Sequence, residues 1–147
     1  MFERLISLVG KDKFSKLQSI KVLVVGIGGV GGYAFEALVR SGFTNITIVD
    51  GDVIEESNLN RQIITSSKLV GMKKVEAAKT RALEINPNIN INTIDEFINL
   101  NNFEDLLMKD NYDYVIDACD DLDLKFLLIK NSNRYKLISS MGTANKV

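Results

Sequence analysis

A glycine-rich stretch near the start of the chain has the composition of a phosphate-binding loop. The sequence "GIGGVGG", residues 26–32, holds five glycines in seven positions, between an apolar run and a helix-like segment. Gly26, Gly28 and Gly31 fit the pattern G-x-G-x-x-G: the first permits a tight turn, the second lets the backbone approach phosphate, and the third allows close helix packing. The amides at the start of the next helix would face the anion. The pattern predicts a nucleotide but does not separate NAD from ATP.

Asp50 is the second candidate ligand. It ends the β-rich run "NITIVD", 24 residues after Gly26, where a carboxylate can accept hydrogen bonds from ribose hydroxyl groups. The alternative is a simple turn aspartate, because turns favour this residue type. Asp52 fits that turn role better.

Two cations follow in a polar connection that a simple dinucleotide-binding fold does not need. Arg61 and Lys74 lie between the ribose-binding position and the next helix. A triphosphate suits such a pair, because its cleavage moves negative charge onto the departing pyrophosphate. Either cation alone would fit a solvated surface, whereas together they are plausible nucleotide ligands.

Short β-rich runs alternate with amphipathic segments along the chain, which predicts a parallel sheet covered by helices. The five runs are 21–25, 45–50, 88–94, 112–118 and 136–140. Val30, Ala34 and Leu38 recur at helical spacing in the first crossover, with Glu36 and Arg40 on its other side. A second helix ends before Pro87, and two more are expected over 103–109 and 122–134.

The expected fold class is therefore α/β, a Rossmann-like doubly wound, mainly parallel sheet with helices on both faces. The third run alternates isoleucine with asparagine, which suits an edge strand, and the implied strand order is 3-2-1-4-5. The ligand crevice of such a sheet lies beyond the carboxyl ends of strands 1 and 4, where the winding reverses.

The composition of the chain excludes several classes of function. The 147 residues suffice for one domain, and a net charge of -1 announces neither a nucleic-acid nor a membrane surface. One cysteine and no histidine exclude an internal disulfide and a histidine base. The apolar runs are too short to cross a bilayer and no secretion signal is evident, so a cytoplasmic location is expected.

The motifs "GIGGVGG", "IVDGDVIEESNLNRQ", "VGMKK" and "VIDACDD", in this order, resemble the ubiquitin-activating-enzyme-like adenylating superfamily over nearly the whole chain. The resemblance implies ATP and Mg²⁺ as cofactors, bound by one ATP-binding adenylation domain over residues 1–147. It also implies a homodimer. It assigns ribose to Asp50 and the ATP phosphates to Asn58, Arg61 and Lys74, beside the glycine loop with Gly29. Asp120 would organise the magnesium, and Arg4 would reach into the partner's site.

Adenylation needs little beyond these groups. A substrate carboxylate is already ionised at neutral pH and can attack the α-phosphate of ATP without a general base. Cys119 is expected to pack rather than react, since neighbouring aspartates would raise the pKa of its thiol. We expect Asp117 to be solvated. Lys125, Lys130 and Arg134 suggest either a local basic patch or a solvated helix face.

Within the superfamily, "SNLNRQI" and "SSMGTANKV" are most similar to enzymes that adenylate the carboxylate of threonylcarbamoyladenosine in tRNA, whose nucleoside then cyclises with loss of water. Such enzymes typically continue well beyond the fifth strand, so the chain is expected to be a fragment, and it could be inactive alone.

Two alternatives stay open. The first is adenylation of a ubiquitin-like sulfur-carrier protein, with a sulfur-transfer protein as a further candidate partner. The second is an NAD-dependent oxidoreductase domain, which would leave "SNLNRQ" and Lys74 without a role.

Overall fold

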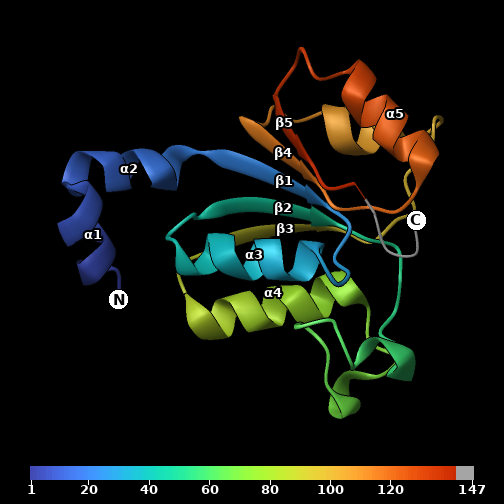
Figure 1. Cartoon of the computed structure of the whole chain (residues 1–147), viewed down its shortest axis with the longest axis horizontal. Coiled ribbons are helices and arrows are strands. Elements are labelled where there is room, and N and C mark those ends of the chain that lie inside the picture. The colour runs from blue at the N-terminus through green and yellow to red at the C-terminus, as the bar shows by residue number, and fades with distance from the viewer. Residues whose placement is uncertain (142–147) are drawn as a thin grey trace.

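The computed structural model describes residues 1–141 and contains the expected five-stranded, all-parallel sheet. Its strands are β1 (Lys21–Val25), β2 (Asn45–Val49), β3 (Asn90–Ile94), β4 (Tyr114–Asp117) and β5 (Lys136–Ser139). Their order is β3-β2-β1-β4-β5, which confirms both the predicted order and the edge position of β3 (Figure 1). The motif residues 142–147 lie outside the described part of the chain.

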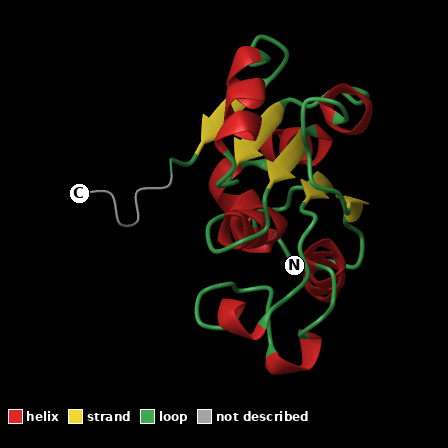
Figure 2. Ribbon diagram, turned by 90° about the vertical axis from the view of Figure 1, so that its right-hand side faces the viewer, coloured by secondary structure: helices red, strands yellow, loops and turns green. Residues whose placement is uncertain are grey.

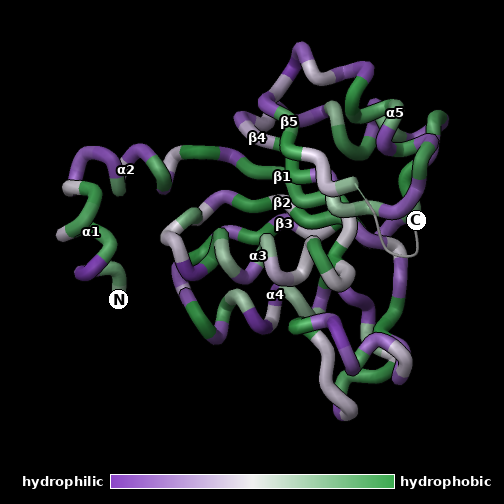
Figure 3. The backbone as a smooth tube through the Cα atoms, in the orientation of Figure 1, coloured by the Kyte–Doolittle hydropathy of each residue, from purple (hydrophilic) through white to green (hydrophobic). Residues whose placement is uncertain are grey.

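Helices cover both faces of the sheet, as predicted. Figure 2 shows the sheet with helices on either side of it. The first face carries α3 (Gly31–Arg40) and α4 (Lys74–Ile85), which bury Phe35 and Val75 against Val24 and Ile48. The second carries α5 (Leu122–Lys130) and the short π-helical segment η3 (Glu104–Met108), which bury Leu128 and Leu107 against Leu23 and Val115. The central strand β1 is accordingly apolar along most of its length (Figure 3).

Several local features differ from the expectations. The structure adds α1 (Glu3–Val9) and α2 (Lys11–Ser19), which the period of the sequence does not predict, because α1 buries no residue and α2 buries only Phe14. The helix expected over 122–134 ends at Lys130. Two short 3-10 turns, η1 (Glu56–Asn58) and η2 (Ser67–Leu69), shape the polar connection after β2. In the described residues no helix is long and apolar enough to span a membrane.

Three charged residues expected at the surface are buried. Glu36 is 7% exposed because α4 brings Arg81 to its carboxylate, with Arg81 Nε 2.6 Å from Glu36 Oε2. Asp117 is 0% exposed and Lys125 is 5% exposed, since the two side chains form an ion pair between β4 and α5. Lys125 therefore belongs to neither a basic patch nor a solvated face. Arg134 is engaged by Glu104.

The carboxyl ends of the strands are in register, and this alignment positions the site. Val25 lies beside both Val49 and Asp117, and Asp117 lies beside Ser139. The segments that follow β1, β2, β4 and β5 consequently start at one edge of the sheet. The helices α1 and α2 extend from the opposite edge (Figure 1).

Candidate functional site

A pocket of about 630 Å³ opens at the carboxyl edge of the sheet, where the crevice was expected. Its walls come from the glycine loop after β1, the turn after β2, the loop after β3 and the loop after β4, together with the polar connection. Eight predicted site residues line it: Gly26, Gly28, Gly29, Asp50, Asn58, Arg61, Lys74 and Asp120. Two others, Gly31 and Arg4, do not.

The glycine loop is shaped by close backbone contacts. Gly26 has φ +88°, and a Cβ there would lie 2.9 Å from the carbonyl oxygen of Ala118. A Cβ on Gly31 would lie 1.7 Å from the carbonyl oxygen of Gly26, so Gly31 lets the start of α3 press against the loop from behind the pocket. A Cβ on Gly28 or Gly29 would make only ordinary van der Waals contacts, with Gln62 Nε2 at 3.8 Å and with Arg61 Cγ at 3.7 Å. The loop therefore leaves room for a phosphate beside the free amides at the start of α3.

Asp50 connects the glycine loop to the turn that follows β2. Its Oδ2 accepts a hydrogen bond from the amide of Ile27 at 2.7 Å, and its Oδ1 accepts one from the amide of Asp52 at 2.8 Å. Each carboxylate oxygen can accept a further hydrogen bond. Asp50 thus braces the glycine loop and keeps acceptor capacity for hydroxyl groups.

The two predicted cations reach the pocket differently. Lys74 is the first residue of α4, is 6% exposed, and places its Nζ 3.0 Å from Asp52 Oδ2. Asp52 therefore holds this ammonium group as well as shaping the turn. Arg61 is exposed, packs its stem over Gly29, and donates to the Ser57 carbonyl oxygen at 2.9 Å. A guanidinium group has five N–H donors, so this contact leaves others for an anion.

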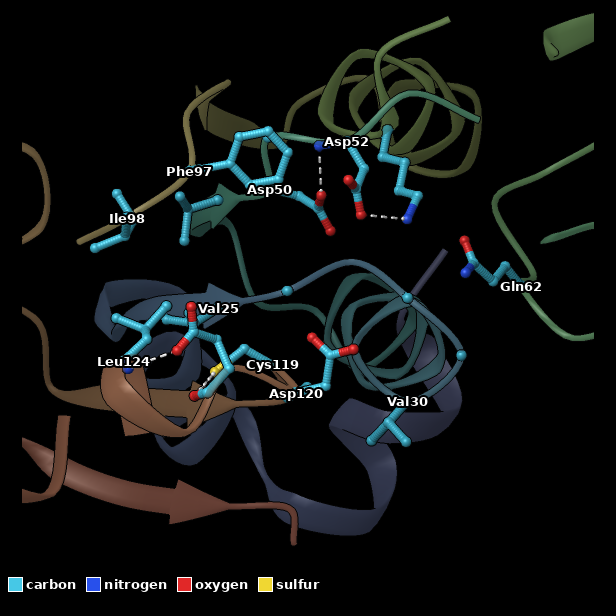
Figure 4. Close-up of a pocket in the computed structure, with 18 of the residues that line it drawn as sticks. Val25, Val30, Asp50, Asp52, Gln62, Phe97, Ile98, Cys119, Asp120 and Leu124 are labelled. Carbon is cyan, nitrogen blue, oxygen red and sulfur yellow. Dashed lines mark hydrogen bonds and ion pairs between the residues drawn. The ribbon is translucent and has the colours of Figure 1, made fainter. Parts of the chain in front are cut away.

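Two buried amide side chains, Asn58 and Gln62, also line the pocket. Asn58 is buried, and its Oδ1 accepts a hydrogen bond from the amide of Glu55 at 3.0 Å. Gln62 is 7% exposed and lies at one end of the pocket (Figure 4), and its Oε1 has no hydrogen-bond partner in the described residues. Sequence reasoning missed Gln62, although it directly follows Arg61 in the polar motif.

The opposite end of the pocket is apolar. Phe97 and Ile98, from the loop after β3, lie there together with Leu124 of α5 (Figure 4). Phe97 is 67% exposed, so its ring is open to a ligand in the pocket. No period or motif indicated Phe97 and Ile98, because they follow an edge strand in an irregular loop.

Asp120 directs its carboxylate into the pocket from the wall opposite Asp50 and Asp52 (Figure 4). It is exposed and accepts no hydrogen bond from the described residues. The neighbouring Cys119 behaves as expected: burial, then the hydrogen bond to Asp117, raises the pKa of its thiol to about 12. Such a thiol is not a nucleophile at neutral pH.

Asp117 lies directly beneath this wall. Burial by itself would raise the pKa of its carboxyl group, but hydrogen bonds from Cys119, Ser139 and Lys125 outweigh burial and hold the pKa below its usual value. Asp117 is therefore an anion within the fold.

The pocket thus combines an apolar end, a carboxylate that is hydrogen-bonded to the glycine loop, two cations and the acidic side chain of Asp120. The sequence pattern of the ThiF family matches residues 2–146. The chain belongs to the ThiF family.

The chain is similar in sequence to curated enzymes and in structure to solved members of the family. The tRNA threonylcarbamoyladenosine dehydratase of Haemophilus influenzae is 41% identical over 126 residues, which are 86% of this chain and 48% of that protein. The crystal structure of the tRNA N6-threonylcarbamoyladenosine dehydratase of E. coli in complex with ATP superposes with a TM-score of 0.93. Its sequence is 34% identical, and the match covers 99% of this chain and 60% of that one.

A third relative has another name. The molybdopterin-synthase adenylyltransferase of Haemophilus influenzae is 33% identical over 140 residues, which are 95% of this ThiF-family chain and 57% of that protein. The chain therefore spans about half the length of the curated relatives that it matches.

Proposed function

We propose that this domain binds Mg²⁺-ATP and transfers AMP to a substrate carboxylate. The substrate that we propose is the threonylcarbamoyl group of modified adenosine in tRNA, whose activated form then cyclises. The observation that carries the proposal is the convergence of Asp50, Lys74 and Asp120 on one pocket from three separate segments. The identity with dehydratases and the near-complete superposition on an ATP complex support the choice of reaction.

The two ends of the pocket set the direction of the nucleotide. An adenine ring fits the apolar end beside Phe97 and Ile98, where stacking on an aromatic ring is favourable. The ribose would then lie at Asp50, and the phosphates would run past the glycine loop toward Lys74 and Arg61. Family membership and this distribution of charge weigh against the dinucleotide oxidoreductase alternative.

The reaction needs alignment and charge compensation more than proton transfer. A carboxylate oxygen of the substrate forms a bond to the α-phosphorus, the bond to the bridging oxygen breaks, and pyrophosphate leaves. Lys74, Arg61 and the amides at the start of α3 would stabilise the negative charge on the departing group. An internal nucleophile of the nucleoside then displaces AMP, which carries away one carboxylate oxygen, so the nucleoside loses one water in total.

The pocket fits a magnesium ion carried by the nucleotide. Mg²⁺ in nucleotide sites is usually held by one or two carboxylates, water and substrate phosphates. Asp120 offers one carboxylate that has no protein partner among residues 1–141, and these residues contain no cluster of three acidic or other metal-binding side chains. Bound Mg²⁺ would neutralise phosphate charge during cleavage.

We also propose that the protein works as a homodimer. Arg4 lies on α1, and α1 extends from the sheet edge opposite the pocket (Figure 1). Arg4 could therefore contact ATP only in the pocket of a second copy.

The deciding experiment mixes purified protein, ATP, Mg²⁺ and tRNA that carries threonylcarbamoyladenosine, and follows the nucleoside by mass spectrometry. We expect a product lighter by one water, formed only with ATP. The protein with Lys74→Ala serves as the negative control. An unchanged nucleoside mass, with a fully modified tRNA and with a longer form of the chain, would rule out this substrate.

Adenylation of a ubiquitin-like sulfur carrier remains the second candidate, favoured by the 33% identity with an adenylyltransferase. The same pocket would serve, because the attacking group is again a carboxylate. ATP–pyrophosphate exchange stimulated by a carrier ending in Gly-Gly, but not by modified tRNA, would select this candidate.

A further inference from the structure

A buried carboxylate beneath the pocket wall gathers donors from three segments. Asp117, at the end of β4, accepts hydrogen bonds from Lys125 Nζ at 2.9 Å, from Ser139 Oγ at 2.5 Å and from Cys119 Sγ at 3.0 Å. It also accepts one from the backbone amide of Cys119 at 3.2 Å. One side chain thus fixes the loop after β4 relative to both α5 and β5.

Lys125 extends the same network to a second part of the wall. Its Nζ also donates to the carbonyl oxygen of Ser140 at 2.8 Å, and the amide of Ser140 donates to the carbonyl oxygen of Asp117 at 2.8 Å. Ser140 and Cys119 both line the pocket, whereas Asp117 and Lys125 do not. The pair therefore supports the wall without touching a ligand.

The carboxylate of Asp120 accepts no hydrogen bond from the described residues, so its position depends on the residues on either side of it. Asp121 is held as the cap of α5, where its Oδ1 accepts a hydrogen bond from the amide of Leu124 at 3.1 Å, and the Asp117 network holds Cys119. An isolated carboxylate that must meet a metal ion needs its backbone fixed, since small displacements of a ligand weaken binding strongly. The hydrogen bond from the Cys119 amide to Asp117 fixes the backbone one residue before Asp120.

Two apolar side chains could fill the space of Asp117 and Lys125, but they would not fix the loop by hydrogen bonds. Replacing a buried ion pair by apolar residues of similar volume is often neutral or stabilising, because no charge loses its hydration. Such a pair would, however, offer no acceptor for the Cys119 amide or the Ser139 hydroxyl group. The charged pair therefore contributes a fixed geometry that packing alone does not supply.

We propose that Asp117 and Lys125 are positioning residues that hold Asp120 where Mg²⁺ bound to ATP can reach it. This inference rests on the proposed function, since it assigns Asp120 to magnesium. Neither residue contacts the nucleotide, and both act through the loop that carries Asp120.

The test compares two variants with one control. Lys125→Met removes the ammonium group and leaves Asp117 unpaired, so this protein could fail to fold. The double variant D117V/K125M replaces the pair by apolar residues, which removes both charges, leaves no unpaired buried anion and deletes the acceptor of the Cys119 amide. Tyr135→Phe is the control. It deletes a buried hydrogen bond from Tyr135 Oη to the carbonyl oxygen of Leu128, which lies on α5 as Lys125 does, and neither Tyr135 nor Leu128 lines the pocket.

Two measurements follow. Titration of ATP with and without Mg²⁺ gives the gain in affinity that magnesium provides, and we expect this gain to fall by about 10- to 100-fold in the double variant. Affinity for ATP without magnesium should change little. Amide hydrogen exchange of residues 118–121, measured without nucleotide, should be faster in the double variant and unchanged in Tyr135→Phe.

The outcomes separate the inference from the function on which it rests. A folded double variant with the wild-type magnesium gain, or with unchanged exchange of residues 118–121, would overturn the inference alone. An equal loss of affinity with and without magnesium would also overturn it, because general damage to the pocket would then explain the result. Absence of any ATP binding by the wild-type protein would overturn the proposed function and the inference together.

Discussion

Lys74 and Arg61 reach the same pocket under different constraints. Lys74 is buried and held by Asp52, so its ammonium group is already in place before a nucleotide arrives. Arg61 is exposed and engaged with the backbone of its own loop. A preorganised charge costs little rearrangement during the reaction, whereas an exposed side chain that bonds elsewhere must be reoriented by the ligand.

We predict that Lys74→Ala and Arg61→Ala each lower ATP–pyrophosphate exchange by on the order of 100-fold or more, because each removes a cation that neutralises the departing pyrophosphate. The fold should persist: Asp52, the ion-pair partner of Lys74, has a side chain that is 54% exposed and can be solvated instead. The matched control is Lys73→Ala, which removes a neighbouring charge that pairs with Asp95 outside the pocket. Near-normal exchange in either variant would contradict the assignment.

At the residue scale, the sequence predicted the residues that line the pocket better than the residues that support its wall. Gly26, Asp50 and Lys74 stand at positions where strands end or helices begin, and the register of a parallel sheet brings such positions together. Gln62 and Phe97 lie in irregular segments whose path depends on tertiary contacts, so no period indicated them. The Asp117–Lys125 pair is equally hidden, because the partners come from different elements and each looks like an ordinary surface charge.

At the scale of elements, the contact between α3 and the glycine loop limits what the loop can tolerate. Gly31 begins the helix and lies against the backbone of Gly26, whereas Gly32 meets only side chains, the nearest being Ile63 Cγ2 at 3.5 Å from an added Cβ. Gly31 therefore has no room for a side chain, whereas Gly32 has room for a methyl group.

We predict that Gly31→Ala destabilises the protein by about 3 kcal/mol or more, because the new methyl group would overlap a carbonyl oxygen that cannot move freely. Gly32→Ala should cost about 1 kcal/mol or less, or even stabilise α3, since alanine favours a helix. Urea unfolding of both variants makes the comparison. Equal losses would show that the loop can shift away from α3.

The ion pair between Glu36 of α3 and Arg81 of α4 should make the stability of the fold depend on pH. Burial would raise the pKa of Glu36, but hydrogen bonds from Arg81 and Arg40 outweigh it and hold the pKa below the usual value. A carboxylate with a lowered pKa in the folded state stabilises the fold above its unfolded pKa of about 4.3, and this contribution is lost as the pH falls through the folded pKa.

Glu36→Gln should therefore lower the free energy of unfolding by on the order of 1–3 kcal/mol at neutral pH, because two guanidinium groups lose their charged acceptor. The difference from the wild type should shrink as the solution becomes more acidic than that unfolded pKa. Unfolding curves across this range provide the measurement. A difference that stays constant down to low pH would show that the charge of Glu36 is not what matters.

The elements themselves were largely predictable. Alternating β-rich and amphipathic segments fixed five strands and their order, because each crossover must bury an apolar stripe on the sheet. The two N-terminal helices were not predicted, because they bury almost nothing on the sheet. The helix α1 has no buried residue and α2 has only Phe14, so no apolar period marks either of them. Arg81 and Glu36 are far apart in sequence, and only the packing of α4 on α3 brings them together.

At the scale of the whole molecule, the pocket and the N-terminal helices lie at opposite edges of the sheet. The carboxyl edge forms the pocket, and the amino edge carries α1 with Arg4 (Figure 1). If Arg4 serves the pocket of a second copy, each complete site needs two chains.

We predict that the inactive variants Arg4→Ala and Lys74→Ala restore activity when unfolded and refolded together. Random pairing makes about half of the dimers mixed, and each mixed dimer has one intact site, so about a quarter of wild-type turnover should return. Pyrophosphate release by the mixture, compared with each variant alone, measures it. No recovery, with mixed dimers demonstrated by tagging one variant, would exclude a role in the partner's site.

The exposed ring of Phe97 at the apolar end of the pocket has a practical use, because the chain contains no tryptophan. Phe97→Trp would introduce a single indole fluorophore beside the proposed adenine position, without background from any other. We predict that ATP quenches or shifts its emission, since stacking changes the polarity around the ring. Stopped-flow traces from this one reporter would then give the arrival and departure rates of the nucleotide in real time, separately from turnover.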